Sequence, residues 1–148
     1  KKLNGKFPEI YHGDLSKYGL SKISKLREEV NKVVRTRVLN PKWINGMKEN
    51  GYKGAFEFSA TIDYLYAFDA TTEVVSNWCY QEIYNSWLCD QDINNFFLDN
   101  NPWALRDISQ RFLEIINRDM WDNPSSDVSE NLKEIILKTD SIIEKNEF

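Results

Sequence analysis

The sequence has little glycine and proline, one histidine and two cysteines, and these scarcities exclude several classes of protein. With 6 Gly and 4 Pro among 148 residues, and with 41% hydrophobic and 14% aromatic residues, the composition is that of a folded globular chain with one core. The only histidine, His12, lies near the N-terminus. It argues against a Ser-His-Asp triad and excludes a site of several histidines within this chain, so metal ligation would need cysteines and carboxylates alone.

Positive charge and long apolar runs are also scarce. The formal net charge is -4 and the pI is near 5.1, which excludes the basic field that attracts nucleic acid. No apolar run reaches the roughly 18 to 20 residues that span a bilayer, and the Lys-rich opening lacks the apolar core of a secretory signal. No phosphate-binding loop of the G-x-x-x-x-G-K-[ST] type occurs. We therefore expect a cytoplasmic chain that does not hydrolyse ATP by itself.

The two cysteines, Cys79 and Cys89, fall on one predicted helix. Their separation along such a helix is too large for a disulfide. Lone thiols in a chain of this kind are mostly small core residues. We expect both cysteines to be buried and to carry no chemistry.

The spacing of apolar residues predicts an all-α fold of about six helices. From Ser21 onward, apolar residues recur every three or four positions, which is the period of one helical face. Residues 1–20 show no clear period and are expected to be a less ordered tail or connector. Residues 21–148 are expected to form a single, irregular helical domain. No repeat of fixed period is visible, so a solenoid is not predicted.

Two Asn-Pro pairs, Asn40-Pro41 and Asn101-Pro102, mark predicted helix starts. Asparagine is a good N-cap and proline fits the first helical position. Between these starts, residues 55–69 form a run that is apolar on most sides, with strand as the competing assignment because of its aromatic and β-branched residues. Such a helix is usually buried or shared between subdomains.

Asp63 is the candidate catalytic residue, because it lies inside this apolar stretch. A buried carboxylate there can accept protons from ring nitrogens. The alternative is that Asp63 is satisfied by structural partners, which is the more common role of buried carboxylates. Asp69 is expected to help end the same helix.

Trp43, Lys42 and Arg37 are the candidate substrate-binding residues. A tryptophan ring can stack on a flat conjugated macrocycle, and the two cations can pair with carboxylates. The alternative for Trp43 is a packing contact between the first two helices. Three other tryptophans are expected to make core or subunit contacts, namely Trp78, Trp87 and Trp103.

Four stretches of the sequence resemble the C-terminal region that the large subunits of cobaltochelatase and magnesium chelatase share. The resemblance covers roughly residues 35–138 and rests on residues 35–57, 60–72, 101–106 and 118–121. Magnesium-chelatase large subunits tend to read Gly-Trp-Ser where this chain has Ala67-Phe68-Asp69. That difference favours the cobalt branch.

The resemblance implies a role within a much longer parent protein. It implies a large, corrin-binding subunit that receives Co²⁺ as substrate for insertion into hydrogenobyrinic acid a,c-diamide, while separate ATPase-type subunits hydrolyse ATP. The implied partners are the remainder of the large subunit, those ATPase subunits and the corrinoid. We expect the segment itself to bind no cofactor and to be inactive alone. The alternatives are magnesium chelatase and a purely structural module that closes the large subunit.

Overall fold

The computed structural model describes residues 20–146, and this part of the chain confirms the all-α prediction. Seven α-helices occur in it, where about six were expected, and no strand occurs among these residues. The tail predicted for residues 1–20 lies outside the described residues, apart from Leu20, which begins the first helix. Within residues 20–146, no helix has the length and apolar character needed to cross a membrane.

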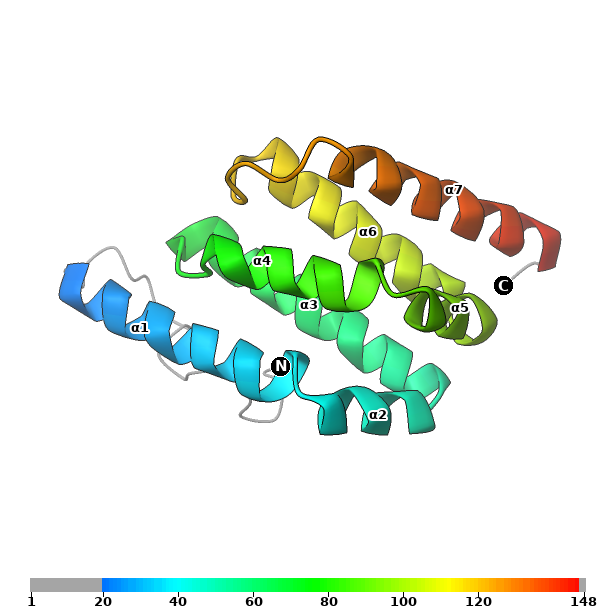
Figure 1. Ribbon diagram of the computed structural model, residues 1–148, viewed down its shortest axis with the longest axis horizontal. Helices are drawn as coiled ribbons and strands as arrows, with labels where there is room; N and C mark the ends of the chain where they lie inside the picture. Colours follow the sequence, from blue (N-terminus) through cyan, green and yellow to red (C-terminus); the bar gives the residue numbers. More distant parts are fainter. Residues whose placement is uncertain (1–19, 147–148) are drawn as a thin grey trace.

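Two of the helices end in a wider, π-helical turn. Figure 1 labels the seven α-helices. The first group of elements comprises α1 (Leu20–Val33), the π-helical turn η3 (Val34–Val38), α2 (Pro41–Glu49) and α3 (Tyr52–Thr72). The second group comprises α4 (Asn77–Ile83), the π-helical turn η4 (Tyr84–Leu88), α5 (Gln91–Asn100) and α6 (Pro102–Asn117). The last helix is α7 (Val128–Asn146).

The two groups repeat the same order of elements, which the sequence analysis did not detect. Each group runs through a helix, a π-helical turn, a short helix and a long helix. The turns η3 and η4 begin at Val34 and Tyr84, and the long helices begin at Tyr52 and Pro102. Equivalent elements therefore begin 50 residues apart in both cases. The chain is a short helical repeat of two units followed by α7.

The repeat produces two layers. Hydrogen bonds join α1 to α4 through Asn31 and Cys79, and η4 to α7 through Tyr84 and Asn131, so these helices form one layer. In the other layer α3 packs against α6. Figure 1 shows α1–α2, α4–α5 and α7 as three rows that run from left to right, with α3 and α6 returning between them. The short helices α2 and α5 connect the layers at one end.

Contacts between the two units have a characteristic separation along the chain. The side-chain hydrogen bonds between the two units join residues 45 to 52 positions apart. One of them joins the two π-helical turns directly, because the indole N–H of Trp87 donates to the backbone oxygen of Val38 at 3.1 Å. Neighbouring units are thus held in a fixed register.

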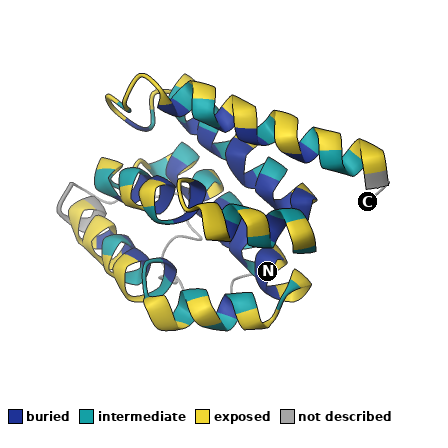
Figure 2. Cartoon of the chain, turned by 45° about the vertical axis from the view of Figure 1, so that its right-hand side comes forward, coloured by how far each residue is buried: buried dark blue, intermediate teal, exposed yellow. Residues whose placement is uncertain are grey.

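The core lies between the layers and is rich in aromatic rings. Phe58 of α3 stacks on Trp87 with ring centroids 3.7 Å apart. A second group, formed by Tyr80, Phe112 and Trp121, packs α4 and α6 against the residues that follow α6. Figure 2 shows the buried residues concentrated between the rows and the exposed ones on the outer sides of α1 and α7. Helix α3 is buried on several sides, as its apolar run predicted.

The predicted helix starts are confirmed, while several finer predictions need correction. The side chains of Asn40 and Asn101 accept hydrogen bonds from Lys42 N–H and Ala104 N–H, as N-caps do. Helix α3 continues to Thr72 rather than ending at Asp69, because hydroxyl and backbone hydrogen bonds sustain its last turn. Cys79 is buried as expected, but Cys89 is exposed because it follows η4 rather than lying within a helix.

Candidate functional site

The outward sides of α3 and α6 form a continuous surface, the α3–α6 face. Its residues recur at every third or fourth position on both helices, so each set lies along one side of its helix. The face consists of Tyr52, Phe56, Ser59, Asp63 and Tyr66 on α3, and of Trp103, Asp107, Arg111, Glu114 and Arg118 at and after α6. It is aromatic at one end and charged toward the other.

Asp63 lies near the middle of this face and is paired. Its Oδ1 accepts a hydrogen bond from Arg111 Nε at 2.7 Å, and Arg111 also contacts Glu114 at 3.2 Å. Burial raises the pKa of Asp63 and the nearby Asp107 adds to that effect, while the hydrogen bond from Arg111 opposes it. The carboxylate of Asp63 is therefore held in an ion pair with Arg111, although a large part of the side chain remains exposed.

Arginines cover Tyr66 further along the face. The guanidinium of Arg111 lies 5.1 Å from the centre of the Tyr66 ring, and that of Arg118 lies 6.0 Å from it. Arg118 Nη1 also donates to the Tyr66 hydroxyl at 3.1 Å. These cation–π contacts and the hydrogen bond connect the residues at the centre of the face with those at its charged end.

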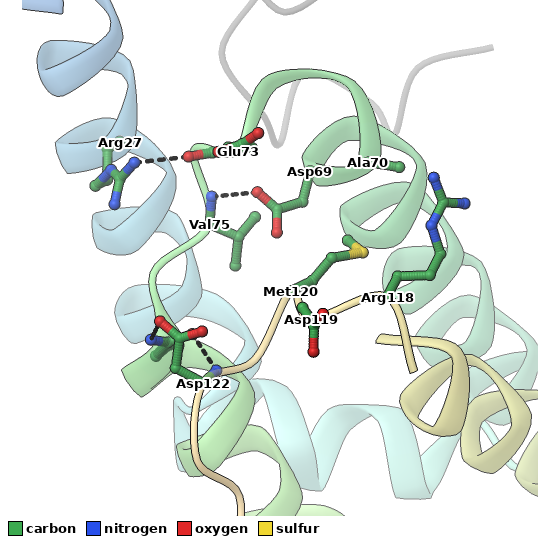
Figure 3. Close-up of a pocket in the computed structure, with 10 residues that line it drawn as sticks. Arg27, Asp69, Ala70, Glu73, Val75, Arg118, Asp119, Met120 and Asp122 are labelled. Atoms are coloured by element: carbon green, nitrogen blue, oxygen red, sulfur yellow. Dashed lines mark hydrogen bonds between the residues drawn. The ribbon is translucent and has the colours of Figure 1, made fainter. Parts of the chain in front are cut away.

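A polar pocket of about 410 Å³ lies at that end (Figure 3). It is bounded by α1, the C-terminal ends of α3 and α6, and the start of α4. Its charged lining residues are Arg27, Asp69, Glu73, Arg118, Asp119 and Asp122. Carboxylates outnumber guanidinium groups there, and the C-terminal ends of helices add partial negative charge. The pocket therefore suits a hydrogen-bond donor or a cationic group.

Asp69 is the buried carboxylate of this pocket. Its Oδ2 accepts a hydrogen bond from the Tyr80 hydroxyl at 2.5 Å, and its Oδ1 accepts one from Val75 N–H at 2.8 Å. Burial raises the pKa of Asp69, while the hydrogen bonds from Tyr80 and Val75 and the charge of Arg27 oppose that rise. Burial, with the charge of Asp69, raises the pKa of Tyr80 far above its usual range. Both oxygens of Asp69 thus fix the loop between α3 and α4.

Left-handed backbone is concentrated around the same pocket. Glu73, Asp119 and Asn123 have φ of 55°, 58° and 54°, and they are the non-glycine residues with positive φ in the described part of the chain. Such residues cluster at functional sites, but a left-handed residue is also a common way to end a helix. Glu73 ends α3 in this way, with its N–H donating to Asp69 O at 2.9 Å. The left-handed residues are therefore consistent with a functional pocket, but they do not indicate which reaction or ligand it serves.

The predicted substrate-binding residues lie elsewhere in the molecule. The ring of Trp43 makes edge contacts with Phe58 and Trp87, at centroid distances of 6.2 and 6.1 Å. The Arg37 guanidinium lies 5.5 Å from the Trp43 ring, and burial lowers its pKa while the charge of Glu57 opposes that change. Lys42 is exposed.

Trp43 and Asp63 therefore have different partners. Asp63 pairs with α6, whereas Trp43 packs into the core against α3 and η4. This packing favours the structural interpretation of Trp43. Sequence reasoning did not select Asp69 or Arg118 as site residues, although Asp69 shows the same signal as Asp63, a carboxylate inside an apolar run. Among residues 20–146, no three His, Cys, Asp or Glu side chains gather in a way that could hold a metal ion.

Comparison with known proteins gives matches from one family. The sequence profile of the CobN/magnesium chelatase family matches residues 1–128. The aerobic cobaltochelatase subunit CobN of Pseudomonas aeruginosa is 46% identical over 127 residues, which is 86% of this chain and 10% of that protein. The chloroplastic magnesium-chelatase subunit ChlH of Oryza sativa subsp. indica is 30% identical over 141 residues, which is 95% of this chain and 10% of that protein.

A solved structure shares the fold. The catalytic subunit of cobaltochelatase from Mycobacterium tuberculosis is similar with a TM-score of 0.76 and 39% sequence identity, over 78% of this chain and 10% of that chain. The chain thus spans about a tenth of the length of the relatives it matches.

Proposed function

The chain belongs to the CobN/magnesium chelatase family, and we propose that it is a C-terminal segment of the large, corrin-binding subunit of a cobaltochelatase. In this proposal the complete enzyme inserts Co²⁺ into hydrogenobyrinic acid a,c-diamide. The metal and the ring are substrates of the whole complex, and separate ATPase-type subunits hydrolyse the ATP. The segment contributes part of the large subunit and is inactive alone.

One observation carries the preference for cobalt. The chain is more similar to a cobaltochelatase subunit than to a magnesium-chelatase subunit, even though the match to the latter covers more of the chain. Ala67-Phe68-Asp69 supports the same preference, and Asp69 of this stretch holds the loop beside the polar pocket. Magnesium chelatase is the alternative enzyme.

Within the large subunit, the segment has two candidate roles. In the first, Asp63 acts as a proton acceptor near the ring, and Trp43, Lys42 and Arg37 contact the corrinoid. In the second, the segment is a structural module that closes the subunit. The ion pair of Asp63 with Arg111 and the packing of Trp43 against Phe58 favour the structural role.

Insertion assays with the full-length large subunit and its ATPase subunits test the proposal. We expect insertion of Co²⁺ into the corrin substrate and none of Mg²⁺ into protoporphyrin IX, and the reverse result would contradict the cobalt assignment.

The same assay separates the two candidate roles of the segment. If Asp63 is structural, Asp63→Asn retains its insertion rate, whereas loss of a general base lowers the insertion rate at least about a hundredfold. Trp43→Ala should weaken corrinoid binding by about 1 to 3 kcal/mol only if its ring stacks on the macrocycle.

A further inference from the structure

Large apolar side chains are exposed together at the aromatic end of the α3–α6 face. Tyr52, Phe56 and Trp103 are 64%, 61% and 50% exposed, and they line one groove of about 430 Å³. Only one other large apolar residue, Leu137, is comparably exposed among the residues whose side chains are described. Scattered single apolar residues are normal on a protein surface, whereas a contiguous group marks an interaction site.

The position of this aromatic groove in the repeat distinguishes it from the ends of the stack. Figure 2 shows exposed residues along the outer sides of α1 and α7, and in the sequence these residues are mainly charged and polar, with Leu137 as the apolar exception. The described residues of these outer faces present no contiguous apolar group. The aromatic groove instead lies at the starts of α3 and α6, the two equivalent long helices.

The surroundings of the aromatic groove have the composition of an interface between folded parts. Polar pairs border the aromatic centre: Ser59 donates to Asp107 at 3.3 Å, and Arg106 pairs with Asp140 at 2.6 Å. Protein interfaces commonly have a centre enriched in aromatic residues and arginine, surrounded by a polar rim. The charged stretch around Asp63 and Arg111 continues this rim along the same face.

We propose that the aromatic groove is the surface on which the preceding part of the large subunit packs, through an apolar ridge of that same polypeptide. This inference rests on the proposed function, that the chain is a C-terminal segment of a large subunit. The relatives are about ten times as long as the matched region, so most of such a subunit lies outside this chain. That remainder is the partner that is permanently present, which fits an exposed aromatic surface better than a transient ligand does.

Hydroxyl-radical footprinting of the intact large subunit tests the proposal by comparing residues of the same type. We expect Phe56 and Trp103 to be oxidised as slowly as the buried Phe112 and Trp87. Leu137, which is exposed but outside the groove, should be oxidised faster than the buried Leu105. Fast oxidation of Phe56 and Trp103 in the intact subunit would overturn the proposal.

Further samples identify other occupants. Protection that appears only after ATPase subunits or corrinoid are added assigns the groove to those partners and overturns the proposal. Protection of the groove in the 148-residue chain alone also overturns the proposal. If that protection is independent of protein concentration, residues 1–19 cover the groove. If the protection increases with protein concentration, a second copy of the chain covers it. The result does not depend on the metal inserted, so an intact subunit that inserts magnesium would contradict the proposed function and leave this inference intact.

A matched pair of variants gives a second readout in the full-length subunit. Phe56→Ser combined with Trp103→Ser should speed proteolytic release of this segment, because it removes the apolar centre of the interface. Leu137→Ser removes a similarly exposed apolar side chain outside the groove and should leave release unchanged. Equal release from both variants would contradict the proposal.

Discussion

Asp69 shows how the fold constrains a single residue. Its carboxylate is buried, which raises its pKa above the ordinary value of 3.8. Between that value and the raised pKa, the folded chain keeps a proton that the unfolded chain has released. The free energy of unfolding therefore decreases as pH rises through this window, because the unfolded state binds fewer protons.

Asp69→Asn removes this titration while keeping a side-chain oxygen that can accept from Val75 N–H. We expect the free energy of unfolding of the variant, measured by urea denaturation at several pH values, to decrease less with rising pH than that of the parent protein, because the carboxyl of Asp63, whose pKa is also raised, still contributes. Tyr80→Phe is the informative control. It removes a hydrogen bond that lowers the pKa of Asp69, so the decrease should extend to higher pH. A pH dependence identical in all three proteins would contradict the assignment.

At this scale the sequence predicted which residue types matter better than what they contact. It identified Asp63 as unusual and it gave the packing alternative for Trp43. It did not give the partner of Asp63, because Arg111 lies 48 positions away and only the register between α3 and α6 brings the two together. Trp103 was expected to make core or subunit contacts, and it is not a core residue, because its side chain is 50% exposed. Helical spacing alone does not say which side of a helix has a neighbour.

Among the elements, α6 depends on its N-cap. Asn101 is buried, and its side-chain oxygen accepts from Ala104 N–H. We expect Asn101→Ala to lower the free energy of unfolding by about 1 to 2 kcal/mol, toward the upper end of the usual loss for a cap. Asn40→Ala, at the more exposed cap of α2, should lower the free energy of unfolding by less. Asn101→Asp should retain most of the stability. Urea denaturation measures all three, and equal losses at both alanine variants would contradict the role of burial.

Helix starts were predictable because caps and prolines are local signals. The π-helical turns η3 and η4 were not predictable from the sequence, because they depend on contacts between the units, such as the hydrogen bond from Trp87 to Val38. The end of α3 was placed too early for a similar reason. Asp69 was expected to help end the helix, but the hydroxyls of Thr71 and Thr72 hydrogen-bond back to Phe68 of the helix, and Asp69 fixes the loop further on.

For the whole molecule, the layered repeat predicts unequal local stability. Helix α3 contacts α2, α5 and α6, whereas α7 packs chiefly against α6. Elements with fewer buried contacts open at lower free energy. We expect amides in the middle of α7 to exchange faster with deuterium than amides in the middle of α3, measured by native-state hydrogen exchange of the chain. Equal protection of both helices would show that the units unfold only together.

The fold class was predictable at this scale, but the repeat was not. Helical periodicity is strong along most of the chain, which is why the all-α prediction holds. The recurrence at 50 residues lies in the order of the elements and in the positions where they begin, while the residues at equivalent positions differ, as in Asn40 and Asp90 at the caps of α2 and α5. The α3–α6 face could be located only once the two units were placed side by side.

The unequal connections of the repeat determine where its length can change. Only Asn50 and Gly51 lie between α2 and α3, and Asn101 alone separates α5 from α6. An inserted residue there would rotate a long helix and displace every contact that faces the other unit. Between α6 and α7, residues 118–122 are held by the buried Trp121 and by the hydrogen bonds between Asn77 and Asp122, whereas the largely exposed stretch from Asn123 to Asp127 has no such restriction. Insertions and deletions should therefore be tolerated in that stretch, which directly follows Asp122 of the polar pocket and can change the edge of the pocket while Trp121 stays in the core.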